Sequence, residues 1–578
     1  MQIDTEMKRL MQDHPSSSMI PSNMHNAEMW QAYWKSQGQP WRIEPIIDGE
    51  RQQHLLSYWQ GEVDIERGMY PFKGVRLSRA DVEWLLAAQK QSSAEEDTGG
   101  SKSEYSQKSP GLDVRGADLS GVNLSYLPLM SLHAGLSLEE GRHATVEQSR
   151  QAATNLAKVD LTHAQLQRAQ LSWATLDEAV LVEAHLEGAD LGKASLRQTI
   201  LAGTHLEGAD LTKAHLEEST LLEAHLEAAM LQGAYLEEAN LFEAHLEGAK
   251  LMGAHLEGAR LFGTHFEGKA LDGDELKRLR AWMPHFPEVL TAADLRGVFL
   301  NTHTHLDGLH GGNDQYGYVA LGDVHWGDVN LTVVDWTALK RLGDETISGL
   351  LPVQEDEGTQ LSERGSPVRM ERTVDMLLRA QEVSDVVVNY VMRSPILMNR
   401  LRERLVQEER GQPETRQQLE REQLRAAVRA YRQLAVVLRA QGLNEAADRF
   451  AYRARVLQRR VLRRSGIRAS GPYLFSCFLD VLAGYGYRPG RTVVAYLSTI
   501  LSFAIIYYVL GHFVLHQPAM SPLYALIVSI ISFHGRGFFP AGFLPGLPMA
   551  VFAACEAVIG LTIEISFIAT FTQRYFGR

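Results

Sequence analysis

The sequence predicts a mixed, multidomain fold that joins a four-sided β-solenoid, a helical region and a membrane domain with two spanning helices. Three observations lead to this prediction. Leucine recurs at every fifth position from Leu161 to Leu261, residues 492–511 contain no charged side chain, and a second apolar segment covers residues 549–572. A chain of 578 residues is also longer than a single domain usually is.

Charge and cysteine content limit the class of protein. The formal net charge is −13, and residues 155–273 hold 19 Asp or Glu against 8 Lys or Arg. Residues 451–491, by contrast, hold nine Arg and the single acid Asp480. Cys477 and Cys555 are the only cysteines, which excludes a disulfide framework and predicts a reducing compartment. The polar residues 1–13 predict no cleaved secretory signal.

The five-residue period predicts the solenoid. A small residue, usually Ala, stands two positions before each Leu, as in Ala164 and Ala169. A period of five fits neither an α-helix, with about 3.6 residues per turn, nor a flat strand, with a side-chain period of about 2. It fits a coil with four sides of five residues, each of which points one Leu and one small residue inward.

This pattern, A(D/N)LXX, resembles that of bacterial pentapeptide-repeat proteins over roughly residues 155–273. Shorter pieces of it stand at residues 117–119, 122–124, 293–295, 329–331 and 334–336. The resemblance implies a right-handed quadrilateral β-helix, whose central run would be roughly 28 Å long at about 4.8 Å per coil. We expect this solenoid over residues 111–342, with interruptions at about 130–154 and 274–290.

The remaining soluble segments are expected to surround the solenoid. An open solenoid end must be covered, and residues 1–88 resemble the leader that precedes many such arrays. The other segments follow from composition and apolar periodicity: a disordered insert at 89–110, an acidic linker at 343–367, a helical region with one TPR-like hairpin at 368–465, and a basic juxtamembrane segment at 466–491.

A possible surface ladder of histidines follows from the repeat. Five histidines recur at intervals of one 20-residue coil and should stack in one column: His185, His205, His225, His245 and His265. Outward-facing Glu187 and its equivalents in the other coils should flank this column. Histidine titrates near neutral pH, so the ladder could be a pH or metal sensor. The alternative, which we favour, is a solvated ladder left by repeat duplication. A straight column does not converge on a metal ion, so we predict no metal site and no cofactor.

The C-terminal 90 residues predict a multi-pass membrane domain. We expect spanning helices at residues 492–515 and 548–573, because about 20 apolar residues cross the hydrocarbon core. Residues 522–533 are apolar but too short to span, which favours a re-entrant helix over residues 522–540. The Arg-rich segment places the start of the first span in the cytoplasm. Both termini of an inner (plasma) membrane protein would then be cytoplasmic.

This order of span, short helix, Gly-rich loop and span resembles the two-span potassium-channel pore family. Residues 556–561 and 567–572 look like the inner helix of that family, and Gly560 falls where its hinge glycine lies. The resemblance implies an ion channel built as a homotetramer. The filter-like loop of this chain consists of Ser532, Phe533, His534, Gly535, Arg536, Gly537 and Phe538. It departs from the TVGYG-type run that forms the selectivity filter in that family. Four Arg536 side chains facing the axis would repel cations, so potassium selectivity is not predicted.

Two acids lie inside the second predicted span. Glu564 shares a helical stripe with Gly560 and Ile568, so four copies could form an acidic ring in the inner cavity. We hypothesise that Glu556 pairs with Arg536 behind the loop. Both acids could instead anchor the helix bundle, since a charge in the hydrocarbon core needs a partner or water.

No catalytic motif stands in a suitable context, so an enzyme is not expected. The sequence favours a membrane ion channel with a cytoplasmic sensor or assembly domain. Its expected partners are lipid, a permeant inorganic ion, further copies of the chain, and an unknown cytoplasmic protein or ligand on the solenoid. The alternative is a non-conducting, membrane-tethered interaction scaffold, which Arg536 favours. Mimicry of DNA by the acidic rod is a third possibility that tethering disfavours, and no nucleic-acid partner is expected.

Overall fold

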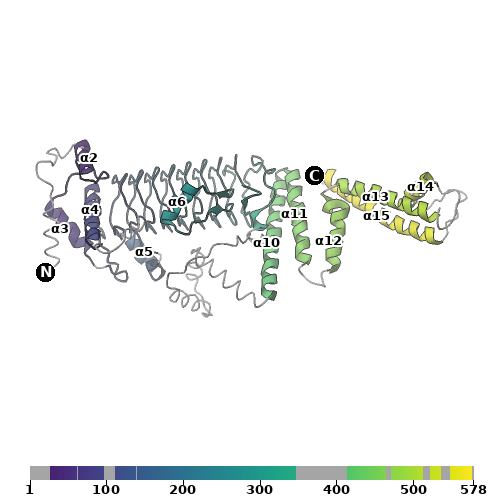
Figure 1. The fold of residues 1–578 in the computed structure, drawn as a ribbon, viewed down its shortest axis with the longest axis horizontal. Coiled ribbons are helices and arrows are strands. Elements are labelled where there is room, and N and C mark those ends of the chain that lie inside the picture. The colour runs from purple at the N-terminus through teal and green to yellow at the C-terminus, as the bar shows by residue number, and fades with distance from the viewer. Residues whose placement is uncertain are drawn as a thin grey trace. The chain divides into compact units, whose positions relative to one another are not determined.

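A computed structural model describes residues 27–61, 63–96, 111–137, 139–345, 413–463, 470–487, 489–511, 521–535 and 547–575. The chain divides into two compact units, Met1–Gln412 and Pro413–Arg578. Figure 1 shows the stacked coils of the first unit and the helices of the second. The predicted linker at 343–367, apart from residues 343–345, residues 97–110 of the predicted insert and residues 368–412 of the predicted helical region lie outside the described residues. Residues 89–96, the first part of the predicted insert at 89–110, instead continue a helix that runs from Arg79 to Glu96.

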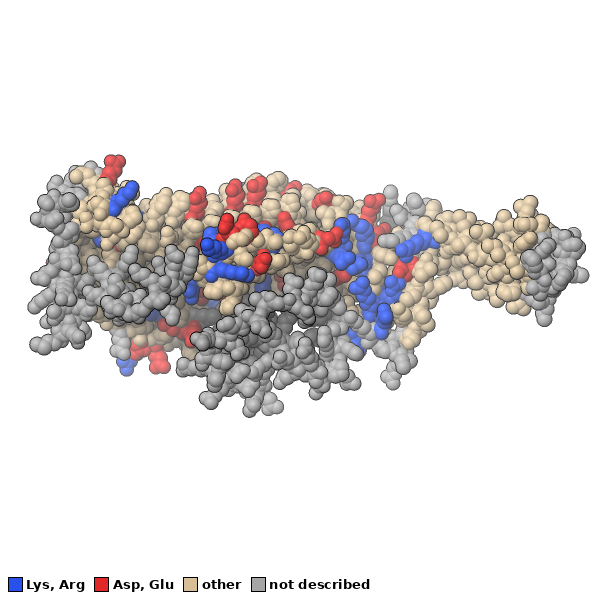
Figure 2. All heavy atoms as spheres, in the orientation of Figure 1, with Lys and Arg blue, Asp and Glu red and all other residues tan. Residues whose placement is uncertain are grey.

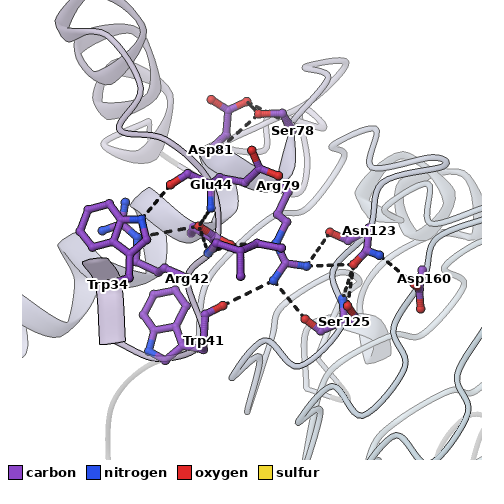
Figure 3. Close-up of polar contacts among 12 residues, drawn as sticks. Trp34, Trp41, Arg42, Glu44, Ser78, Arg79, Asp81, Asn123, Ser125 and Asp160 are labelled. Carbon is purple, nitrogen blue, oxygen red and sulfur yellow. Dashed lines mark hydrogen bonds and ion pairs between the residues drawn. The ribbon is translucent and has the colours of Figure 1, made fainter. Parts of the chain in front are cut away.

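The solenoid begins under a helical cap. Helices α2 (Ala27–Ser36), α3 (Gly49–Trp59) and α4 (Arg79–Glu96) lie at its N-terminal end (Figure 1). The guanidinium group of Arg79 donates to the carbonyl oxygens of Asn123 and Ser125 in the first coils, at 3.1 and 3.2 Å (Figure 3). The edge of the first coil is paired as well, since Leu77 N donates to Asp118 O at 3.0 Å. The cap therefore satisfies backbone groups that an open end would leave unpaired.

Glu83 holds the cap together from inside. Its side chain is fully buried, and it accepts hydrogen bonds from Arg79 Nε at 2.8 Å, Ile43 N at 3.0 Å and Glu44 N at 3.0 Å. A buried carboxylate is tolerated because its oxygens have these donors. Glu83 thereby joins α4 to the segment between α2 and α3.

The coils confirm the predicted β-solenoid. Parallel bridges link residues 20 positions apart, as in His185↔His205 and His205↔His225, so one coil contains four sides of five residues. The Leu residues of the run from Leu161 to Leu261 are at most 1% exposed, and the Ala residues two positions before them are equally buried. The column of Leu and Ala is thus the core of the unit.

Each corner of a coil requires a left-handed backbone. The residue two positions after each Leu has a positive φ, for example 51° at Glu183 and 68° at Gly188. This conformation costs a non-glycine residue about 1–2 kcal/mol. The corner is held by its neighbour in the next coil, since Glu183 N donates to Ala202 O at 3.0 Å. Hydrogen bonds between coils therefore stabilise a turn that the side chain alone disfavours.

Two insertions interrupt the coils. The first contains the short helix η1 (Glu140–Arg142) and helix α5 (Val146–Ala152). The second contains β1 (Lys269–Ala270), α6 (Gly273–Trp282) and β2 (Val289–Leu290), with β1 and β2 paired antiparallel. After it the coils resume, because Lys250 bridges to Asp294. Strands β3 (Gly312–Asn313) and β4 (Gly317–Tyr318) and the short helix η2 (Gly343–Glu345) complete this end.

The second unit is entirely helical over its described residues. Helices α10 (Pro413–Ala440) and α11 (Asn444–Arg463) form a hairpin around a turn at Gly442, which has a φ of 78°. Helix α12 (Ser470–Ala483) and the short helix η4 (Gly484–Gly486) follow. Helices α13 (Pro489–Val509), α14 (Pro522–Phe533) and α15 (Leu547–Tyr575) make up the rest.

Two of these helices are long and apolar enough to cross a membrane. They are Gly490–Val509 in α13 and Met549–Ala569 in α15, with mean hydropathies of 1.8 and 1.9. Helix α14 is apolar but shorter, with 12 residues. It begins where Ser521 accepts a hydrogen bond from Tyr524 N and Pro522 occupies the first turn, a common helix start.

Candidate functional site

The short helix α14 packs against both long apolar helices. One cluster joins Tyr507 of α13, Ala525 and Val528 of α14, and Met549 of α15. A second joins Ile500, Phe533 and Ile563 of the same three helices, together with Leu482 of α12. Side chains from all three helices are thus fixed relative to one another, and the polar groups between them form the first candidate site.

Glu556 lies buried at the centre of this three-helix module. Tyr507 Oη donates a hydrogen bond to Glu556 Oε2 at 2.7 Å, and Ser529 Oγ contacts Glu556 Oε1. Ser529 Oγ also lies 2.8 Å from the carbonyl oxygen of Ile500. A hydroxyl group has one proton, so a neutral, protonated Glu556 that donates to Ser529 satisfies every contact.

The hypothesised partner of Glu556, Arg536, lies outside the described residues, as do Gly537 and Phe538. Within the described part of the chain, both Glu556 oxygens face hydroxyl groups rather than a cation. The sequence reasoning missed Tyr507 and Ser529. Their signal was available, because a buried acid in an apolar helix needs hydroxyl or amide partners at the same depth.

Gly560 permits the closest approach between α14 and α15. A Cβ atom built on Gly560 would lie 2.1 Å from the carbonyl oxygen of Phe533, far inside van der Waals contact. Helix α15 is continuous through this position. Gly560 therefore faces α14 in this structure, whereas its predicted stripe neighbour Ile568 is 63% exposed.

His534 links the end of α14 to both long helices. Its Nδ1 atom lies 2.8 Å from the carbonyl oxygen of Ile530, its Nε2 atom lies 3.1 Å from Tyr496 Oη, and Nε2 lies 3.5 Å from Glu564 Oε1. Glu564 also lines a cavity of about 520 Å³ together with Val493, Tyr496, Phe567 and Ile568. Of the predicted loop, Ser532 and Phe533 are buried, and Gly535 has a φ of 63°.

The outer faces of the module are apolar and exposed. Residues with more than half of their surface exposed lie on α13 and α15: Val494, Leu497, Leu501 and Ile505, and Val551, Val558, Leu561, Ile565 and Ile568. So large an apolar surface marks a contact with lipid or protein.

Basic side chains gather on the helices that precede the module. Figure 2 shows Lys and Arg side chains concentrated over α10 and α11. Asp480 of α12 accepts hydrogen bonds from Arg459 at 2.6 Å, Tyr452 at 2.9 Å and Arg491 at 3.2 Å. Burial alone would raise the pKa of Asp480, but these partners lower it. The one acid of the Arg-rich segment therefore fastens α11 and the start of α13 to α12.

The predicted histidine column forms the second candidate site. Neighbouring rings from His185 to His265 stack with centroids 4.7–5.0 Å apart and planes within 7°. His310 extends the stack at 5.0 Å; sequence reasoning missed it because the α6 insertion breaks the spacing of 20. Four groups of His and Glu in the described solenoid offer possible ligand atoms within 4.8 Å of one another, for example His185, Glu187 and His205. The parallel stacking of the rings is the arrangement from which no convergent metal site was predicted.

The glutamates beside this column are buried, which corrects the expectation of an outward-facing, solvated ladder. The side chains of Glu187, Glu207 and Glu227 are at most 1% exposed and that of Glu247 is 5% exposed. The insertion around α6 folds back and covers them. Two of its cations pair with all four: Arg278 with Glu187 and Glu207, and Lys269 with Glu227 and Glu247.

The histidines complete the charge balance of these carboxylates. Each Nδ1 atom in this part of the column lies 3.2–3.4 Å from a Glu Oε1 atom. The hydrogen bond to Glu187 raises the pKa of His185, and that to Glu227 raises the pKa of His225. Burial alone would raise the pKa of Glu227, but His225 and Lys269 outweigh it and lower that pKa to about 2.

Comparison with known proteins identifies the repeat. A family model described as pentapeptide repeats matches eight copies, within residues 154–192, 179–217, 189–227, 219–258 and 229–268. No curated protein matches the chain.

Several solved structures are similar to the solenoid. HetL, a pentapeptide repeat protein involved in heterocyst differentiation regulation from the cyanobacterium Nostoc sp. strain PCC 7120, is 26% identical, with a TM-score of 0.18 over 37% of this chain and 86% of that chain. QnrB1, a plasmid-mediated fluoroquinolone resistance protein, is 16% identical, with a TM-score of 0.21 over 36% of this chain and 91% of that chain. A pentapeptide repeat protein from the thylakoid lumen of Arabidopsis thaliana is 27% identical, with a TM-score of 0.13 over 22% of this chain and 75% of that chain. The family match and the 20-residue coils together show that residues 154–268 consist of pentapeptide repeats.

Proposed function

We propose that the C-terminal unit forms an ion-conducting pore of the two-span type, assembled as a homotetramer, with the pentapeptide-repeat unit as its cytoplasmic sensor or assembly domain. The observation that carries this proposal is the position of α14. This 12-residue apolar helix is about 18 Å long, too short to cross a hydrocarbon core of about 30 Å. It is nevertheless packed between two helices that are long enough to cross it.

The buried contacts of α14 support a re-entrant position. Ser529 of α14 contacts Glu556, and Gly560 lets the end of α14 approach α15. Backbone that is not part of a spanning helix is tolerated at membrane depth only when it is buried in protein or lines a water-filled cavity. The contacts of α14 with α13 and α15 are of this kind, since they bury the faces of α14 that meet these helices.

The charges around the first span support a cytoplasmic N-terminal unit. Arg residues of α11 precede α13 and Arg491 lies in the first turn of α13, and such residues favour the cytoplasmic side of a membrane. Helix α12 exposes an apolar face of Leu474, Phe475, Phe478 and Val481. A short helix with exposed apolar residues on one face and an ion pair on the other suits the membrane interface.

One subunit of this module encloses no complete pore, so conduction requires assembly. The exposed apolar residues of α13 and α15 would be covered partly by neighbouring subunits and partly by lipid. Glu564 is partly exposed and lines the cavity beside α13 and α15. In a fourfold assembly, four copies would give the permeation path a negative ring that attracts cations.

Recordings from purified full-length protein in planar bilayers test this proposal. We expect cation currents that fall in Glu564→Gln and persist in Glu564→Asp, which keeps the charge. Native mass spectrometry should give four chains per particle. An unchanged conductance in Glu564→Gln would remove Glu564 from the path, and an assembly without four copies would reject the pore architecture.

A non-conducting scaffold is the second candidate. The presence of Arg536 in the loop after α14 favours it, because a ring of four Arg side chains repels cations. Absence of current from a correctly assembled tetramer, at every pH and voltage applied, would support the scaffold. Restored current in Arg536→Gly would instead show that the pore is present and that Arg536 blocks it.

A further inference from the structure

The solenoid loses its close packing in its last coils. Bridges there link residues 26 positions apart, Asp294↔Ala320 and Phe299↔His325, instead of 20. The additional residues include the β3–β4 hairpin (Gly312–Asn313 and Gly317–Tyr318). A coil of this length no longer places one Leu and one Ala from every side against the coil below it.

The inward-facing leucines of the last coils are more exposed than those of the regular coils. Leu295, Leu306 and Leu321 are 7%, 6% and 9% exposed, whereas Leu206 and Leu226 in the regular coils are 1% exposed. The space beside them is a cavity of about 450 Å³. Protein interiors are normally packed without voids of this size, and 300–1,000 Å³ is about the range of small-molecule sites.

The walls of the cavity are apolar and aromatic. They include the three leucines, Trp326 from the last coil and Trp336 from the segment that closes this end of the unit. An apolar cavity does not hold water well and accepts apolar molecules instead. Tryptophan faces also attract cations more strongly than other aromatic rings do.

The charged residues that line the cavity have one sign. Glu267 and Asp335 are its acidic residues, Asp335 Oδ1 also accepting hydrogen bonds from Thr337 N and Oγ1, and no Lys or Arg is among the lining residues of this described region. His310 lines the cavity as well, and its ring stacks on that of His265. Glu267 Oε1 lies 3.1 Å from His265 Nδ1. Aromatic faces and carboxylates beside apolar walls match a ligand that combines an apolar body with a positive charge.

We propose that this cavity binds a hydrophobic ammonium compound. Its apolar body contacts Leu295, Leu306 and Trp326, and its cationic group lies beside the carboxylates of Glu267 and Asp335. The proposal concerns the N-terminal unit alone and does not depend on whether the C-terminal unit conducts ions.

Calorimetric titration of the full-length protein in phosphatidylcholine nanodiscs tests the proposal. The probe is octyltrimethylammonium, and octanesulfonate is the anionic control of equal chain length; heats from empty nanodiscs are subtracted. We expect saturable binding of the ammonium compound and at least about tenfold weaker binding of the sulfonate, since the carboxylates at the site repel it.

Two variants locate the site. Ala338 lines the cavity and is exposed, so Ala338→Trp fills the space without disturbing the core, and we expect affinity to fall at least about tenfold. Glu267→Gln should weaken binding about fivefold, as expected for a partly exposed ion pair. Glu257→Gln, which changes a glutamate that does not line the cavity, should bind as the native protein does.

Three results would overturn the proposal. They are heats no larger than those of empty nanodiscs, equal affinity for the ammonium and sulfonate probes, and unchanged affinity in Ala338→Trp. Thermal unfolding of each variant checks that it is folded. Should Ala338→Trp fail that check, unchanged affinity in Glu267→Gln, with Glu257→Gln as its control, would overturn the proposal in its place.

Discussion

Replacement of Arg278 by Met removes the charge shared by two buried carboxylates and keeps a long side chain. Arg278 donates to Glu187 at 2.8 Å and to Glu207 at 2.6 Å. Loss of one partner of a buried ion pair costs about 3–5 kcal/mol. The cost is lower here because the Arg278 side chain is 36% exposed and each Glu keeps a histidine partner. We expect a loss of about 2 kcal/mol, or about 30-fold in the opening equilibrium of these coils.

The loss should depend on pH because the remaining partners are histidines. The pKa values of His185 and His225 are raised in the folded protein, mainly by their hydrogen bonds to Glu187 and Glu227. Their contribution to stability is therefore complete below the unfolded pKa of about 6.5 and is lost as pH rises through the folded pKa. The native coils should be less stable above this range than below it, and Arg278→Met should lose more stability at high pH, where neutral His185 no longer offsets Glu187.

The stability of these coils can be measured by hydrogen exchange and mass spectrometry on the full chain, in peptides from residues 180–230. The exchange rates are corrected for the intrinsic pH dependence of exchange. Arg197→Met is the matched control. Arg197 pairs with Glu217 at 3.1 Å, but the two side chains are 49% and 24% exposed, so its loss should cost less than about 1 kcal/mol. Equal effects of the two variants, or an Arg278→Met effect that does not change with pH, would refute the charge-balance argument.

Two further substitutions test packing elsewhere in the chain. Gly560→Ala would place a Cβ atom 2.1 Å from the Phe533 carbonyl oxygen. We expect this substitution to lower the stability of the C-terminal unit in detergent by about 1–3 kcal/mol. Gly490→Ala, whose added Cβ atom would meet no atom within 4 Å, serves as the control. Glu83→Ala should destabilise the cap by about 3 kcal/mol because it leaves the Arg79 Nε–H group and two backbone N–H groups without their acceptor. Limited proteolysis near residues 39–48 would report it, and unchanged cleavage would contradict the role assigned to Glu83.

The histidine column shows which contacts could be predicted from the sequence and which could not. Its members were predictable from a period of 20, since coils of equal length place equivalent residues above one another. His310 was not predictable in this way. It follows His265 by 45 positions because of the α6 insertion, although the two histidines lie in adjacent coils. The burial of the neighbouring glutamates was also missed. It depends on contacts between Arg278 and residues 71 and 91 positions earlier, which no local pattern reveals.

The sequence by itself determined the features that repeat or accumulate along the chain: the Leu and Ala core of the solenoid, and the two helices apolar enough to span a membrane. Hydropathy and period are local properties, so they can be recognised residue by residue. The tertiary structure alone decided where single polar groups find partners, as in the meeting of Glu556 with Tyr507 and Ser529, and where the coils open into a cavity. Those outcomes depend on how distant segments pack, and packing is a property of the folded chain as a whole.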